Sequence, residues 1–102
     1  SVAGEGVIIE SHVDTKKGIS AIVLIKDGTL RKGETIVSGE SLASLRYIEN
    51  FKNERIEEAS FSSPVRVTGW SIIPKVGDSF TSFKDKKEAQ EFLEYLGFPF
   101  KK

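Results

Sequence analysis

The sequence has no cysteine, no methionine and a single histidine, His12. Without cysteine the chain has no disulfide scaffold, no thiol nucleophile, no iron–sulfur cluster and no cysteine-ligated zinc. A lone histidine also excludes a metal site built from several imidazoles, and a histidine base needs a nucleophile beside it. We interpret His12 as a solvated strand residue whose charge is balanced by Glu10 and Asp14, and we expect neither a metal nor a cofactor.

Long apolar runs and an excess of charge of either sign are also missing. The longest uninterrupted apolar run, Ala21 to Ile25, is far shorter than the ~20 residues that a membrane span needs, and no charged-then-apolar leader begins the chain. Fifteen basic residues balance fifteen acidic ones, so any contact with a polyanion must be local. We expect a protein without a membrane partner, located in the cytoplasm or in an organellar matrix.

The sequence patterns of nucleotide-binding enzymes are absent. No G-x-x-x-x-G-K-[ST] loop occurs, and no G-x-G-x-x-G opens a helix after a strand. The adjacent acidic residues Glu57 and Glu58 would point to opposite faces of a strand, so they cannot act on one substrate. At 102 residues the chain has the size of one domain, and we predict that it is not an enzyme. Because it starts at Ser1 and contains no methionine, we expect it to be either a processed chain or a fragment of a longer protein.

Short segments of alternating apolar and polar residues make up most of the chain. The segment from Gly6 to Asp14 is predicted to bury the face formed by Val7, Ile9, Ser11 and Val13. The next segment, Ile19 to Lys26, is predicted to be buried on both faces. Further strands are expected at residues 34–38, 42–49 and 55–59, from Val65, and around Phe80 and Phe83. Six or seven such strands separated by Gly, Pro, Asp and Asn are typical of a barrel or a sandwich. We predict an all-β fold, a small closed antiparallel β-barrel over residues 1–84.

The C-terminal segment changes to helical spacing. Apolar residues recur there every three or four positions, at Ala89, Phe92, Leu93 and Leu96. Asp85 and Glu88 form a capping box, and Gly97 is a typical stop signal. We predict one amphipathic helix over residues 85–97, which leads toward a following domain. Residues 98–102 are predicted either to fold back on the barrel or to continue toward that domain.

Basic residues lie at the expected turns. They come in three groups, which are Lys16 with Lys17, Arg31 with Lys32, and Arg46 with Arg55 near the middle hairpin. Turns at one rim of a barrel can present such side chains to phosphates, so we predict these six residues as RNA contacts. The alternative interpretation is that they only keep the surface soluble. Three aromatic residues, Phe51, Phe61 and Trp70, either stack on bases or belong to the core or to a domain interface.

Several stretches of the sequence resemble a known family. Residues 17–34, K-G-I-S-A-I-V-L-I-K-D-G-T-L-R-K-G-E, are similar to the signature of the barrel domain that follows the GTPase domain in translation factors. Residues 55–69 and residues 73–80, I-P-K-V-G-D-S-F, narrow the resemblance to domain II of bacterial-type translation initiation factor 2. The segment 85–91 is similar to the helix that leaves this domain. The resemblance covers about residues 5–92.

Three positions depart from the family pattern. Lys17-Gly18-Ile19 replaces Arg-Gly-Pro, which keeps a charge and loses a rigid turn. A glycine of the family is absent at Ser60 or Phe61, and Ser44 stands in place of a basic residue. The change at Ser44 removes a phosphate donor from the strand beside Arg46.

The resemblance implies a domain that performs no chemistry within a factor that hydrolyses GTP. It further implies that this domain couples the GTPase domain of the same chain to later domains and docks on the rRNA of the small ribosomal subunit during initiation. Contact with initiator tRNA is expected to be indirect, and the isolated domain is expected to be a monomer. The alternative is a related barrel that binds an aminoacyl or peptide ligand in a pocket between strands, ringed by Arg46, Arg66 and Trp70.

Overall fold

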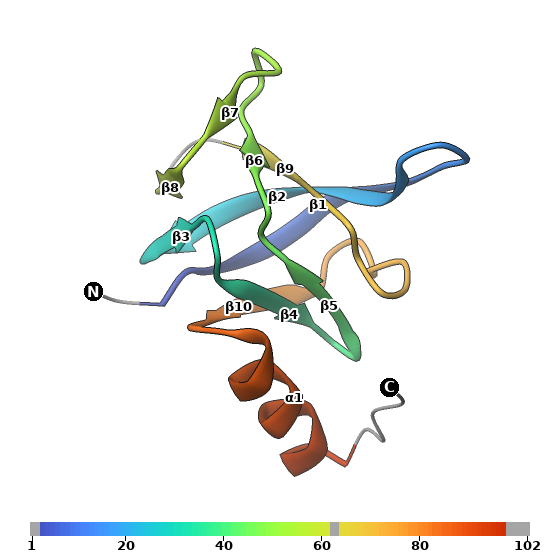
Figure 1. The fold of residues 1–102 in the computed structure, drawn as a ribbon, viewed down its shortest axis with the longest axis vertical. Helices are drawn as coiled ribbons and strands as arrows, with labels where there is room; N and C mark the ends of the chain where they lie inside the picture. The colour runs from blue at the N-terminus through green and yellow to red at the C-terminus, as the bar shows by residue number, and fades with distance from the viewer. Residues whose placement is uncertain (1–2, 62–63, 98–102) are drawn as a thin grey trace.

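The computed structural model describes residues 3–61 and 64–97, in which ten strands are followed by one helix (Figure 1). The elements are β1 (Glu5–Asp14), β2 (Gly18–Asp27), β3 (Thr29–Arg31), β4 (Thr35–Ser38), β5 (Ser41–Ser44), β6 (Ile48–Glu49), β7 (Arg55–Ile56), β8 (Glu58–Ser60), β9 (Pro64–Thr68), β10 (Ser79–Phe83) and α1 (Lys86–Tyr95). No helix among the described residues is both long enough and apolar enough to cross a bilayer. The all-β class with one C-terminal helix is confirmed.

Eight of the strands form one antiparallel sheet in the order β5-β4-β10-β1-β2-β9-β6-β7, and β3 pairs separately with β8. The sheet curls so that its first strand meets the segment that follows β9. There the amide of Ser71 donates to the carbonyl of Leu42 at 2.8 Å, and Ala43 forms an antiparallel bridge with Trp70. The short strand β7 stands at the other end of the order. The barrel that the sequence predicts is therefore a curled sheet that closes only in part.

The predicted buried face of β1 is wrong. Ile8 is the buried residue, with 1% of its surface exposed, whereas Val13 is 62% exposed and Ile9 is 38% exposed. The register between β1 and β2 shifts between Ile8 and Glu10, so Ile9 lies in a β-bulge and the alternation of faces is broken there. In β2, Ala21, Val23 and Ile25 are buried, and the residues between them are half-buried. The predicted burial of both faces of β2 is thus confirmed for one face and only in part for the other.

The strand predicted over residues 42–49 is divided into β5 and β6. Between them Leu45 leaves the sheet, since its amide donates to the carbonyl of Glu34 and its carbonyl accepts from the amide of Gly33, both at 2.8 Å. These two hydrogen bonds connect the turn after β3 to the segment between β5 and β6. Leu45 is buried, and Arg46 beside it is exposed.

The core lies inside the curl. Its largest buried side chains come from both sheets and include Ile8, Ile25, Leu30, Ile36, Leu45, Ile48 and Phe80. Trp70 belongs to the same cluster, and its indole N–H donates to the carbonyl of Val67 at 3.0 Å. A buried indole needs such an acceptor because an unpaired donor in the core is costly.

Helix α1 forms as the sequence predicts and packs on β4 and β10 (Figure 1). The carboxylate of Asp85 accepts from the amide of Glu88 at 2.9 Å, and Gly97 ends the helix with a φ of 93°. Ala89 and Leu93 are buried in a second apolar cluster with Val37 and Leu42 from the sheet. The predicted apolar position Leu96 is instead 49% exposed. The expectation for residues 98–102 falls outside the described residues.

Candidate nucleic-acid interface

The outer face of the sheet carries polar side chains because the inner face supplies the core. On β9, Val65 and Val67 are buried, so Arg66 and Thr68 point outward. Thr68 pairs with Ser20 of β2, which pairs in turn with His12 of β1. Two residues before Thr68 in β9, Arg66 pairs with Ile22 of β2 and with Glu49 of β6. Side chains directly opposite one another on neighbouring strands lie about 5 Å apart, so these residues form one continuous surface.

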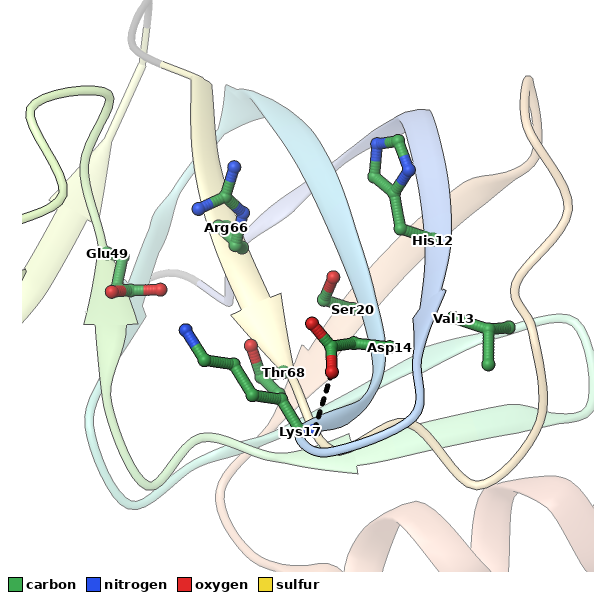
Figure 2. A pocket seen from close by; sticks show the side chains of 8 residues that line it. All are labelled: His12, Val13, Asp14, Lys17, Ser20, Glu49, Arg66 and Thr68. Atoms are coloured by element: carbon green, nitrogen blue, oxygen red, sulfur yellow. Dashed lines mark hydrogen bonds between the residues drawn. The ribbon is translucent and has the colours of Figure 1, made fainter.

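A hollow of about 340 Å³, here called the central hollow, opens on this surface (Figure 2). Its charged lining is mixed in sign, with Asp14 and Glu49 among the acids and Lys17 and Arg66 among the bases. Figure 2 shows Lys17 reaching from the β1–β2 turn toward the side where Glu49 and Arg66 lie. His12 also lines the hollow, and its Nε2 lies 3.1 Å from a carboxylate oxygen of Glu10.

The turn that presents Lys17 is organised by Asp14. One carboxylate oxygen of Asp14 accepts from the amides of Lys16 and Lys17, at 2.7 and 3.0 Å. These bonds favour the ionised carboxylate, so the pKa of Asp14 lies below its ordinary value, with the amide of Lys16 as the largest cause. Gly18 closes the turn with a φ of 91°, a conformation that glycine adopts readily.

A second hollow of about 450 Å³, here called the basic hollow, lies on the other side of the same turn. It is lined by Lys17, by Arg46 from the β5–β6 connection, and by Lys86, the first residue of α1. The hydroxyl residues Ser44 and Ser71 line it as well, and none of the described residues around it is a carboxylate. Two ammonium groups, a guanidinium and hydroxyl donors around one hollow suit a phosphate group.

The six basic residues predicted from the sequence do not form one surface. Lys17 and Arg46 line the basic hollow, together with Lys86, which the prediction missed. Arg31 and Lys32 are instead paired with carboxylates, Arg31 Nε with Glu58 Oε2 at 3.2 Å and Lys32 Nζ with Glu57 Oε2 at 3.8 Å. These two pairs lie at the β3–β8 pair of strands.

The remaining two predicted residues lie at other places. Lys16 is exposed in the β1–β2 turn. The guanidinium carbon of Arg55 lies 4.1 Å from the ring centroid of Tyr47, a cation–π geometry. Only part of the predicted set is therefore gathered in one place.

The ring of Arg46, Arg66 and Trp70 that an aminoacyl or peptide pocket would need does not form. Trp70 is 4% exposed and belongs to the core, while Arg46 and Arg66 line different hollows. No three His, Asp or Glu side chains gather into a metal-binding arrangement within the described segments. What remains is a surface with one hollow of mixed charge and a second hollow lined by basic and hydroxyl side chains.

Comparison with known proteins places the chain among translation factors. The family model described as elongation factor G domain 2 matches residues 3–83. Translation initiation factor IF-2 from Lysinibacillus sphaericus is 40% identical over 89 residues, which are 87% of this chain and 12% of that protein. IF-2 from Syntrophotalea carbinolica is 44% identical over 87 residues, 85% of this chain and 9% of that protein. The chloroplastic IF-2 of Rhodomonas salina is 40% identical over 89 residues, 87% of this chain and 12% of that protein.

A solved structure supports the same fold. The crystal structure of GDP-bound aIF5B from Aeropyrum pernix superposes with a TM-score of 0.66 over 91% of this chain and 18% of that chain, at 15% sequence identity. The chain spans only 9% to 12% of the length of the IF-2 relatives described above.

Proposed function

The chain belongs to the elongation factor G domain 2 family and is a domain of a translation factor of the IF-2 type, and from this premise we propose that it docks on the rRNA of the small ribosomal subunit. In this proposal the domain performs no chemistry itself. It couples the GTPase domain of the parent factor to later domains during initiation, and it meets initiator tRNA only indirectly.

The basic hollow is the observation that carries the docking proposal. Lys17, Arg46 and Lys86 come from a turn, a connection and a helix, and they converge on one hollow without a carboxylate among its described lining residues. The net charge of the chain is zero, so only a local concentration of positive charge can attract a phosphate backbone. This hollow supplies such a concentration.

The coupling role is supported by the way α1 is held. Ala89 and Leu93 are buried against Val37 and Leu42, and the rings of Phe83 and Phe92 lie 4.9 Å apart. A helix packed through an apolar face moves with the sheet that it covers. Lys86 at its start is also part of the basic hollow, so a contact with rRNA would act on the sheet and the helix together.

The test is the binding of the 102-residue chain to isolated 30S subunits over a series of salt concentrations. Docking through phosphates predicts an affinity that falls steeply with salt, because bound phosphates release counterions. A triple variant, Lys17→Ala, Arg46→Ala and Lys86→Ala, is expected to bind more weakly and to lower the slope of log K against log salt by roughly two to three.

A matched control removes three exposed charges outside the hollow, with Lys26→Ala, Lys75→Ala and Lys87→Ala. The control changes the net charge equally and should leave the slope nearly unchanged. Binding that is undetectable at low salt, insensitive to salt, or equally weakened by both triple variants would contradict docking through the basic hollow.

A further inference from the structure

Phe51 is an exposed aromatic residue that the docking proposal does not use. It lies in the connection between β6 and β7 with 73% of its surface exposed. It lines a hollow of about 210 Å³ together with Asn53, Pro64 and Arg66, here called the Phe51 hollow. Like the basic hollow, this one has no carboxylate among its described lining residues.

The Phe51 hollow is joined to the basic hollow through the central hollow. Arg66 lines both the Phe51 hollow and the central hollow. Lys17 and Thr68 line both the central hollow and the basic hollow. The three hollows thus form one track across the outer face of the sheet. It runs from the β6–β7 connection, at the top of Figure 1, to the start of α1, which lies just below β10 and β4 in that view.

The segment that carries Phe51 is fixed by its own hydrogen bonds. The side-chain oxygen of Asn50 accepts from the amides of Lys52 and Glu54, at 2.9 and 3.0 Å. Asn53 completes the turn with a φ of 63°, and its side-chain oxygen lies 3.4 Å from Nη1 of Arg66. The backbone that carries Phe51 and the guanidinium of Arg66 therefore lie beside one hollow. Because this turn is already organised, stacking of a ligand would mainly restrict the side-chain torsions of the ring and not the backbone.

These features match the way in which proteins bind single-stranded nucleic acid. Unpaired bases stack on aromatic side chains, while cationic groups follow the phosphates in a groove. We propose that an unpaired base of RNA stacks on Phe51 in the Phe51 hollow and that the adjoining phosphates follow Arg66 and Lys17 toward the basic hollow. This inference rests on the proposed docking on rRNA and adds to it a site for a single-stranded base.

Two carboxylates in the central hollow, those of Asp14 and Glu49, oppose phosphates along this track. Glu49 lies opposite Arg66 in the strand pairing and lines the central hollow with it, so its carboxylate opposes a phosphate there. Removing that charge with Glu49→Gln is therefore expected to strengthen the binding of single-stranded RNA, most clearly at low salt. RNA bound elsewhere on the surface would respond less to this change at ~0.1 M salt, because screening limits the reach of an exposed charge to about 10 Å there.

The test measures fluorescence anisotropy of a labelled single-stranded RNA of ten nucleotides and of a duplex of the same sequence. Phe51→Ala is expected to weaken binding of the single strand by roughly tenfold, within the range found for base–aromatic stacking, and to leave duplex binding unchanged. Phe51→Trp should retain single-strand binding. The matched control is Phe61→Ala. Phe61 is 68% exposed and shares with Phe51 a neighbouring hollow that contains Glu54 and Glu58, but it does not line the Phe51 hollow beside Arg66.

The outcomes separate this inference from the docking proposal. If the triple variant of the basic hollow weakens RNA binding while Phe51→Ala does not, the base-stacking site is wrong and docking through phosphates stands. If Phe51→Ala and Phe61→Ala weaken binding equally, or if single strand and duplex are affected alike, the base-stacking site is also wrong. If the chain binds 30S subunits in a salt-dependent way but binds neither the single strand nor the duplex at low salt, the base-stacking site is wrong and the docking proposal stands.

Discussion

Lys17 and Lys86 line the same hollow, although one lies in the turn between β1 and β2 and the other begins helix α1. The packing of α1 on β4 and β10 brings Lys86 to the hollow that Lys17 also lines. Like charges around one hollow repel each other, and a bound anion offsets this repulsion. The proposed docking of a phosphate group rests on this relationship.

The first prediction compares two neighbouring lysines of α1. Lys86 lines the basic hollow and Lys87 does not, because successive residues of a helix point about 100° apart. Lys86→Ala is expected to weaken binding to 30S subunits and to lower its salt slope by about one, whereas Lys87→Ala leaves both unchanged. Both substitutions remove a lysine from the same helical turn, so equal effects in a sedimentation assay would argue against a specific role of the hollow.

The second prediction concerns Gly6 in β1. A side-chain Cβ at this position would lie 1.9 Å from the carbonyl oxygen of Leu24 and 2.7 Å from a ring carbon of Phe80. Because backbone on one side and a buried ring on the other must move, Gly6→Ala is expected to destabilise the fold by about 3 kcal/mol or more. Urea unfolding followed by Trp70 fluorescence measures the change. Glu5→Ala, at an exposed neighbour, should stay within about 0.5 kcal/mol of the wild type.

The third prediction concerns the attachment of α1. Leu93 is 1% exposed and packs with Val37 and Leu42, whereas Leu96 is 49% exposed. Leu93→Ala is expected to lower the free energy of unfolding by roughly 2 to 5 kcal/mol, and Leu96→Ala by much less. Amide hydrogen exchange of the helix should accelerate in the first variant. Unchanged exchange in Leu93→Ala would mean that the helix does not depend on this packing.

The fourth prediction concerns pH and the β1–β2 turn. The pKa of Asp14 is lowered in the folded protein because its carboxylate accepts from the amides of Lys16 and Lys17. A lowered pKa means that the contribution of Asp14 to stability is present above the pKa of the unfolded chain. That contribution is lost as the pH falls through the pKa of the folded state.

NMR titration of the Asp14 carboxyl and of the amides of Lys16 and Lys17 measures this effect. The three signals should shift together, with a midpoint below the ordinary aspartate value. In Asp14→Ala the two amide signals should lose this acid transition. A midpoint at the ordinary value would show that the two bonds do not form in solution.

The parts of the fold that depend on nearby residues follow from the sequence. The helix over residues 86–95 and its Asp85 cap are encoded within a few positions, as are the β1–β2 hairpin and the glycine turns. The face of β1 is not, because a bulge at Ile9 reverses the alternation, and the bulge depends on the register with β2. The break at Leu45 likewise depends on hydrogen bonds to Gly33 and Glu34.

The candidate site was likewise predictable only in part, because its residues are brought together by contacts between segments distant in the chain. Lys17 and Arg46 stand out as basic residues near turns, but so do Arg31 and Lys32, and the sequence does not show that Glu58 and Glu57 pair with these two. Lys86 gave no signal beyond being a lysine at a helix start. Phe51 and Phe61 look alike in sequence, and only the position of Arg66 beside Phe51 distinguishes them.

The class of fold, the amphipathic helix and the resemblance to a domain of translation factors can be predicted from the chain alone, because they rest on local periodicity, turn residues and ordered motifs. The balance of charge over the whole molecule is likewise fixed by composition. Which basic residues meet around a hollow, and which are paired with carboxylates, depends on the folded arrangement. That arrangement requires the curl of the sheet and the docking of α1, which bring together residues distant in the chain.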